Sequence, residues 1–196
     1  MILDATEMNR RLLKLAENPH SRLWRLDYDH LSPPERVFRA VWELEAEVNN
    51  GGFHQYFFNS AGNLAHHVVE ALRAIGATAM AGIAQRAIKA AGYDASESHQ
   101  VRRERVAALA PEPLEMLDAL DQEFYAYPDN LTALLYEYVT EHSQEMGLTD
   151  AFFERRQPSR RPDAKWRLAD LFWNPYFLLA IIIAIALLSK LWSSLS

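Results

Sequence analysis

The sequence of 196 residues contains no cysteine. This absence excludes disulfide bonds, thiolate catalysis and metal sites that depend on cysteine ligands. The sequence also lacks a Walker phosphate loop, a Gly-x-Ser-x-Gly turn and a His-Glu-x-x-His motif. The alternation of apolar and polar residues that is typical of half-buried strands is nearly absent as well. We therefore expect an all-α, non-enzymatic protein that uses no cofactor.

Basic residues are missing from one long stretch of the chain. Between Arg105 and Arg155 there is no lysine or arginine, whereas the same 49 residues contain 11 acidic side chains. A uniformly negative surface attracts basic surfaces and repels nucleic acid. We therefore expect a basic protein partner here, although a solvated surface that serves only solubility is the alternative. The predicted partner-binding residues are Glu112, Glu115, Asp118, Asp121, Glu137, Glu141 and Glu145.

The acidic excess is confined to the first part of the chain. Residues 1–154 carry 24 acidic and 13 basic side chains, a formal charge of −11, whereas residues 155–196 carry 2 and 7, a charge of +5. We therefore divide the chain into an acidic domain over 1–154, a basic linker over 155–170, an apolar segment over 171–192 and a short tail over 193–196.

The apolar segment is long enough to cross a membrane. The 22 residues from Leu171 to Trp192 would form about 33 Å of helix, and a hydrocarbon core is about 30 Å thick. We therefore predict a single transmembrane helix over 171–192. The six basic residues between 155 and 170 favour a cytoplasmic acidic domain by the positive-inside rule. A buried core helix is the alternative, because the uninterrupted apolar run at 176–188 has only 13 residues.

Helix-start signals indicate that the acidic domain is a compact multi-helix bundle. Ser32 and Glu35 form a capping box around a proline, and the residues at 94–97 and Asp129 mark two later starts. Apolar residues then recur at spacings of three and four. The predicted helices cover residues 4–17, 33–49, 53–59, 62–76, 77–91, 96–109, 111–126 and 129–147. Residues 18–32 mix turn residues with large apolar ones and receive no assignment.

The segment EVNNGGFHQYFFNSAGN spans residues 47–63 and joins two of these helices. Asparagine and glycine accept left-handed backbone angles, so the Asn-Asn-Gly-Gly run at 49–52 is explained as a helix cap. Phe53, Tyr56 and Phe57 then recur at i, i+3 and i+4, which places them on one face of a short helix. We expect a tight corner whose aromatic residues fill the core, and a loop that binds a ligand or partner is the alternative.

This segment resembles the signature of the DNA-mimic-protein-type domain family, most of whose members have no assigned function. The matching residues are Asn49, Asn50, Gly51, Gly52, Phe53, Gln55, Tyr56, Phe57, Asn59, Ser60 and Gly62. The resemblance covers about residues 30–147 and implies an all-α fold, often dimeric, without enzymatic activity. It also implies a carboxylate surface that imitates duplex DNA and occupies the binding face of a transcription factor. The implied partners are therefore a DNA-binding protein and a second copy of the chain. A transmembrane segment is not expected in that family.

Two clusters keep an enzymatic alternative open. His66 and Glu70 lie one turn apart on a predicted helix, but a zinc site needs three or four ligands and local spacing places only two. Glu43 and Glu47 could suggest paired catalytic carboxylates, although Arg39 lies four residues before Glu43 and ion pairing explains them as well. We expect no metal. The alternatives to an interaction protein are a small-molecule or metal-dependent enzyme with a site near residues 49–70 and a plain structural module.

Overall fold

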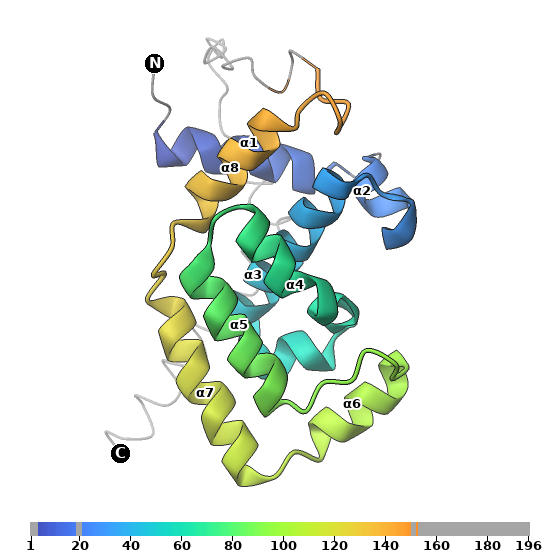
Figure 1. Ribbon diagram of the computed structural model, residues 1–196, viewed down its shortest axis with the longest axis vertical. Helices are drawn as coiled ribbons and strands as arrows, with labels where there is room; N and C mark the ends of the chain where they lie inside the picture. The colour runs from blue at the N-terminus through green and yellow to red at the C-terminus, as the bar shows by residue number, and fades with distance from the viewer. Residues whose placement is uncertain (1–3, 19–20, 150–151, 153–196) are drawn as a thin grey trace, which may run out of the picture. The chain divides into compact units, whose positions relative to one another are not determined.

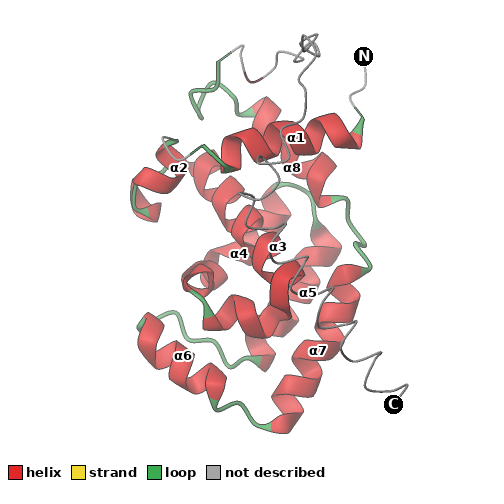
Figure 2. Cartoon of the chain, turned by 180° about the vertical axis from the view of Figure 1, so that it is seen from behind, coloured by secondary structure: helices red, strands yellow, loops and turns green. Residues whose placement is uncertain are grey.

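The computed structural model describes residues 4–18, 21–149 and 152, and every regular element in this part of the chain is helical. Figure 1 shows the order of the helices, and Figure 2 shows them from behind. The elements are α1 Ala5–Ala16, α2 Arg22–Arg25, η1 Tyr28–His30, α3 Pro33–Phe58, η2 Ser60–Leu64, α4 Ala65–Ala74, α5 Thr78–Ala90, α6 His99–Ala107, α7 Pro111–Tyr125 and α8 Leu131–Glu141. The prediction of an all-α bundle is therefore confirmed for the described residues.

Helix α3 is the central element of the bundle. It contacts α4, α6, α7 and α8, while α5 packs between α4 and α7. Helices α1 and α8 pack together at one end, and a short loop joins α6 to the start of α7 at the other end (Figure 1). Since α3 touches most of the other helices, any irregularity in its path changes how the whole bundle packs.

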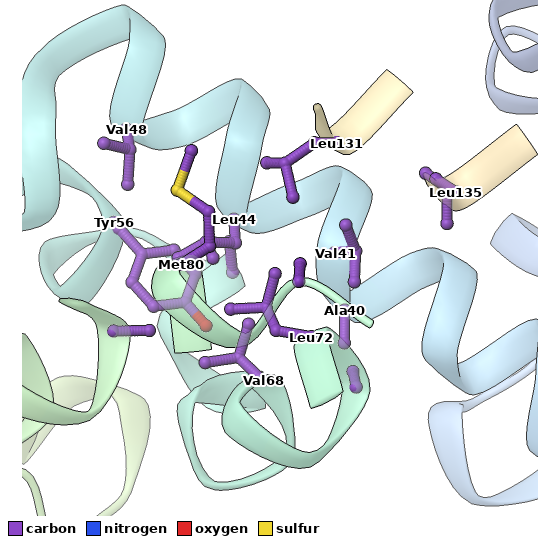
Figure 3. Close-up of a cluster of buried hydrophobic side chains, with 14 of the residues drawn as sticks. Ala40, Val41, Leu44, Val48, Tyr56, Val68, Leu72, Met80, Leu131 and Leu135 are labelled. Atoms are coloured by element: carbon purple, nitrogen blue, oxygen red, sulfur yellow. The ribbon is translucent and has the colours of Figure 1, made fainter. Parts of the chain in front are cut away.

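The core lies along the inner face of α3. Val41 and Leu44 of this helix are completely buried, and they face Leu72 of α4, Met80 of α5 and Leu131 of α8 (Figure 3). Burying a side chain of this size contributes about 1.5–3 kcal/mol to folding. The apolar spacing in the sequence therefore identified the buried face of this helix correctly.

Helix α3 begins at the predicted capping box, whereas α6 does not begin at the capping box predicted for it. The backbone N–H of Ser32 donates to Oε2 of Glu35 at 2.8 Å, as the pattern predicts. The start predicted at residues 94–97 is wrong, because Asp94 accepts hydrogen bonds within its own turn. Ser98 caps α6 instead, and the helix begins one residue later.

The unassigned residues before α3 contain two short helices. Helix α2 and the 3-10 helix η1 precede α3, and α2 contacts α3. Arg39 of α3 holds this segment, since its Nη1 donates to the carbonyl oxygens of Leu23 and Leu26, both at 3.3 Å. These contacts position α2 and η1 as one wall of a cleft beside α3.

The predicted C-terminal segments lie outside the described residues. These segments are the basic linker over 155–170, the transmembrane helix over 171–192 and the tail over 193–196. Within residues 4–18, 21–149 and 152, no helix is both long enough and apolar enough to cross a membrane. The transmembrane helix therefore stays a prediction from the sequence.

Candidate interaction surface and the Asn-Asn-Gly-Gly motif

The Asn-Asn-Gly-Gly motif forms a break inside α3. Gly51 has φ −168° and ψ 29°, and Gly52 has φ 74° and ψ −178°, so the helical path is interrupted for two residues. A backbone conformation such as that of Gly52 is open essentially to glycine alone. Beyond the break the helix resumes, and Phe53, Tyr56 and Phe57 are buried on its inner face, as their spacing predicts.

Two side chains of α7 bind the backbone groups that the break leaves without helical partners. Asp121 Oδ1 accepts a hydrogen bond from the backbone N–H of Phe53 at 2.7 Å. One turn further along α7, the hydroxyl of Tyr125 donates to the carbonyl oxygen of Val48 at 2.8 Å. A helix end needs such partners for its free N–H and C=O groups. Helix α7 therefore caps both halves of α3 at the break.

Asp121 is consequently not part of an exposed acidic surface, contrary to the prediction. Asp121 is only 9% exposed. Burial raises the pKa of its carboxyl group, while the hydrogen bond from the Phe53 backbone opposes that rise. A Cβ atom at position 52 would lie 2.1 Å from Asp121 Oδ2. The second glycine of the motif therefore provides both the backbone angle and the space for this carboxylate.

Two amides downstream of the Asn-Asn-Gly-Gly motif bind one carboxylate. Gln55 Nε2 and Asn59 Nδ2 both donate to Oε2 of Glu47, at 2.8 and 2.9 Å. These bonds cross the break, since Glu47 precedes it and both amides follow it. The residues that follow the motif therefore position the side chain of Glu47, a role that the sequence pattern did not reveal.

The first two asparagines of the motif are exposed. Asn49 Nδ2 donates to the hydroxyl of Tyr127 at 2.6 Å, and that hydroxyl donates to Oε1 of Glu45 at 3.0 Å. The side chain of Asn50 has no hydrogen-bond partner among the described residues. Asn49 thus contributes to the fold at the surface, whereas Asn50 is free to contact a partner.

A buried arginine holds the end of the motif segment. Arg102 of α6 is only 1% exposed, and its Nε donates to the carbonyl oxygen of Phe57 at 2.8 Å. Its Nη2 donates to the carbonyl oxygen of Asn59 at 3.1 Å and to Oδ1 of Asn63 at 2.7 Å. Burial lowers the pKa of this guanidinium, while the C-terminal end of a helix favours a cation. Sequence reasoning missed this residue, because nothing local connects α6 to the motif.

Three acidic residues of the stretch between Arg105 and Arg155, which has no lysine or arginine, form contacts within the fold. Asp121 caps the break in α3, and Asp129 Oδ2 accepts a hydrogen bond from the backbone N–H of Met80 in the first turn of α5 at 2.8 Å. Glu123 binds the guanidinium of Arg86 with two contacts of 2.5 and 2.9 Å. Asp129 was predicted to start the last helix, but α8 is capped by the residue after it.

Five other carboxylates are exposed and make no ion pair with a described residue. Glu112, Glu115 and Asp118 occupy successive turns of α7, and we name them the α7 face. Glu137 and Glu141 lie one turn apart on α8, and we name them the α8 face. Like charges at such spacing destabilise a helix by a few tenths of a kcal/mol per pair. Helix stability therefore does not explain the α8 face, whereas Glu112 of the α7 face lies in the first turn of its helix, where a negative charge is favourable.

Glu145 does not continue the α8 face, contrary to the predicted row along one helix. Helix α8 ends at Glu141, and residues 142–147 form turns. Oε1 of Glu145 lies 2.9 Å from Nδ1 of His142, which gives this carboxylate a local partner. The predicted helix was too long because the first glycine or proline after its start is Gly147, six residues beyond the observed end at Glu141.

The histidines beside the motif have partners within the protein. Nδ1 of His66 lies 3.2 Å from the hydroxyl of Tyr93, and its ring lies 3.7 Å from that of His67. Glu70, the other ligand candidate, pairs with Arg73 at 2.6 Å. Across the part of the chain that the structure describes, no three histidine, aspartate or glutamate side chains gather closely enough to hold a metal ion.

The described residues define a class of protein, an all-helical domain whose long central helix is broken by two glycines and capped from a neighbouring helix. A family model described as DMP19-like protein matches residues 29–142, which is more than half of the chain and includes the motif and α7. The chain therefore belongs to the DMP19-like protein family. No curated protein and no solved structure matches the chain significantly.

Proposed function

We propose that this DMP19-like chain is a non-catalytic interaction module that binds a basic face of another protein through its α7 and α8 faces. The supporting observation is that these five carboxylates are exposed and unpaired, while the neighbouring acids that the fold needs are already bound. A uniform field of this kind attracts a basic surface and speeds its association. A stretch that served only solubility would tolerate cations among its acids, and this one contains none.

Imitation of DNA toward a nucleic-acid-binding protein is the specific form of this proposal. At about 1.5 Å of rise per residue, the α7 face presents three carboxylates over about 9 Å, or one per about 4.5 Å. One strand of duplex DNA carries a phosphate per about 3.4 Å of axis, and both strands together one per about 1.7 Å. The α7 face therefore approaches the charge density of a single strand. The α8 face, or a second copy of the chain, would supply further charge.

The test compares the α7 face with an equal change of charge elsewhere. The face variant is Glu112→Gln, Glu115→Gln and Asp118→Asn, and the matched control is Glu17→Gln, Asp29→Asn and Glu104→Gln, which are also exposed. Crosslinking in native membranes, followed by mass spectrometry, identifies the partners of each chain. We expect the face variant to lose a basic partner that the control retains.

The salt dependence of binding to that purified partner provides a second measurement. Because each lost carboxylate removes an ionic contact, the face variant should show a shallower fall of affinity with salt than the control. A Glu137→Gln, Glu141→Gln variant tests the α8 face in the same way. The same partners and the same salt dependence in all variants would refute the proposal.

The second part of the proposal concerns location. The linker over 155–170 and the apolar segment over 171–192 would hold the acidic domain at the cytoplasmic side of a membrane, and the support is their sequence alone. Fractionation of cells that express the chain with and without residues 171–192 tests this. The complete chain should sediment with membranes and the shortened chain should not. A complete chain that stays in the soluble fraction would contradict the idea.

A further inference from the structure

A cleft of about 600 Å³ lies beside the outer flank of α3, between α3, the α2–η1 segment and η2. No residue of α7 or α8 lines it, so it is separate from the two acidic faces. Its volume falls within the range of about 300–1,000 Å³ that is usual for binding pockets. The lining residues that matter here are Trp24, Tyr28, Arg39, Trp42, Glu43 and Glu47.

Three half-buried aromatic side chains form the apolar walls of this cleft. They are Trp24 of α2, Tyr28 of η1 and Trp42 of α3. The protein already places guanidinium groups over two of these rings, since Arg39 lies 5.5 Å from the Trp24 ring centre and Arg36 lies 5.8 Å from the Tyr28 ring centre. Aromatic faces attract cations through their quadrupole, most strongly in the case of tryptophan. These aromatic walls can therefore bind a cation.

The charges in the cleft leave one carboxylate without a counter-ion. Glu43 is paired with Arg39 at 2.8 Å, whereas Glu47 receives only the two neutral amides of Gln55 and Asn59. Both amides bind Oε2, so Oε1 of Glu47 has no hydrogen-bond partner among the described residues. The amides fix the position of this carboxylate without neutralising it.

The remaining charged residues of the cleft do not supply the missing cation. Arg25 and Asp27 are exposed and carry opposite charges. An anion in the cleft would therefore meet the unneutralised charge of Glu47, and a neutral guest would shield that charge from water without compensating it. A planar cation can instead donate an N–H group to Oε1 of Glu47 and stack on tryptophan at the same time.

We propose that this cleft binds an arginine side chain of a protein partner, with its guanidinium group against Glu47 and the indole rings of Trp24 and Trp42. The Asn-Asn-Gly-Gly motif then has a binding role in addition to its structural one, because its downstream amides orient Glu47. This site does not depend on the α7 and α8 faces, so its test is independent of theirs.

The experiment titrates the ¹⁵N-labelled full chain with the peptide acetyl-Gly-Arg-Gly-amide and records the indole N–H signals. The chain has five tryptophans, and Trp24→Phe and Trp42→Phe variants assign the two signals of the cleft. We expect these two signals to shift saturably while the other three stay in place. The same peptide with citrulline in place of arginine has nearly the same shape and no charge. Its dissociation constant should be at least about tenfold higher.

The matched protein variants are Glu47→Gln and the exposed control Glu17→Gln, which change the net charge equally. Glu47→Gln should raise the dissociation constant of the arginine peptide at least about tenfold, and Glu17→Gln should leave this constant unchanged. If Glu47→Gln does not fold, the comparison of arginine with citrulline still decides the question. Equal affinity for the citrulline peptide, or an unchanged constant in folded Glu47→Gln, would overturn the proposal. Free L-arginine that binds as tightly as the peptide would overturn the assignment to a protein partner.

Discussion

Replacing Gly52 by alanine tests the break in α3 most directly. Alanine would have to adopt φ 74° and ψ −178°, which costs about 1–3 kcal/mol for a residue other than glycine. Its Cβ atom would also lie 2.1 Å from Oδ2 of Asp121, so this side chain must move away. The buried N–H of Phe53 then loses its acceptor, at a further cost of about 1–3 kcal/mol. We expect Gly52→Ala to lower the free energy of unfolding by about 2–6 kcal/mol.

The neighbouring Gly51→Ala substitution is the matched control. Gly51 has φ −168°, an extended angle that any residue adopts. A Cβ atom there would lie 2.2 Å from Oε1 of Gln55, which is the end of a flexible side chain and can rotate away. The hydrogen bond from Gln55 to Glu47 would be lost, at about 0.5–1.5 kcal/mol, and the reduced entropy of the unfolded chain offsets about 0.4–1 kcal/mol. The net change should therefore be within about 1 kcal/mol.

Urea denaturation of the full chain, followed by circular dichroism, measures these differences. The set is completed by Asp121→Ala and the double variant Gly52→Ala, Asp121→Ala. Because Gly52→Ala and Asp121→Ala disrupt the same hydrogen bond, the double variant should cost about 1–3 kcal/mol less than the sum of the two. Equal stability of Gly51→Ala and Gly52→Ala, or strict additivity in the double variant, would refute the reasoning.

Three further predictions concern buried and titrating groups. Arg102→Met leaves three oxygen acceptors without their donor and should lower the free energy of unfolding in urea by about 3 kcal/mol or more; a loss below about 1 kcal/mol would contradict this. Burial lowers the pKa of His67 below 6.5, so the folded state binds fewer protons and stability should fall as pH drops below 6.5. Urea titrations across this range should show a flatter pH dependence in His67→Gln. Hydrogen bonds from Arg10 and Arg11 lower the pKa of Glu7 to about 2, so its stabilising effect is complete above pH 4.5 and is lost as pH falls toward 2. Glu7→Gln should lack this acid-dependent loss. An unchanged dependence of stability on pH would show that the contacts of Glu7 with Arg10 and Arg11 do not contribute to stability.

Local patterns predicted the helices well where they contain both a start signal and a regular apolar spacing. The capping box at Ser32 and the apolar spacing that continues through Leu44 led to the correct start and buried face of α3. The prediction failed where a cap lies in another part of the chain. Asp129 matches the pattern of a local helix start, but it caps α5 instead. The fold brings Asp129 and Met80 together although they lie 49 positions apart in the sequence.

Reasoning from the sequence predicted the exposed acidic residues, but it did not predict which acidic residues bind groups within the fold. Glu112 and Glu137 lie at the surface, as expected of carboxylates in a stretch without lysine or arginine. Asp121 belongs to the same stretch, but its position on α7 places it against the break in α3. Composition does not distinguish the two situations, because both kinds of residue carry the same charge.

The sequence alone determined the all-α class, the family, the position of the glycine motif and the sign of the exposed charge, because each depends on residue type and short-range spacing. Only the tertiary structure decided what the motif does. Phe53 and Asp121 lie 68 positions apart, and Glu47 meets Gln55 and Asn59 only because the chain changes direction at Gly51 and Gly52. Such contacts depend on how whole helices pack, and helix packing follows from the sum of many buried surfaces rather than from any one motif.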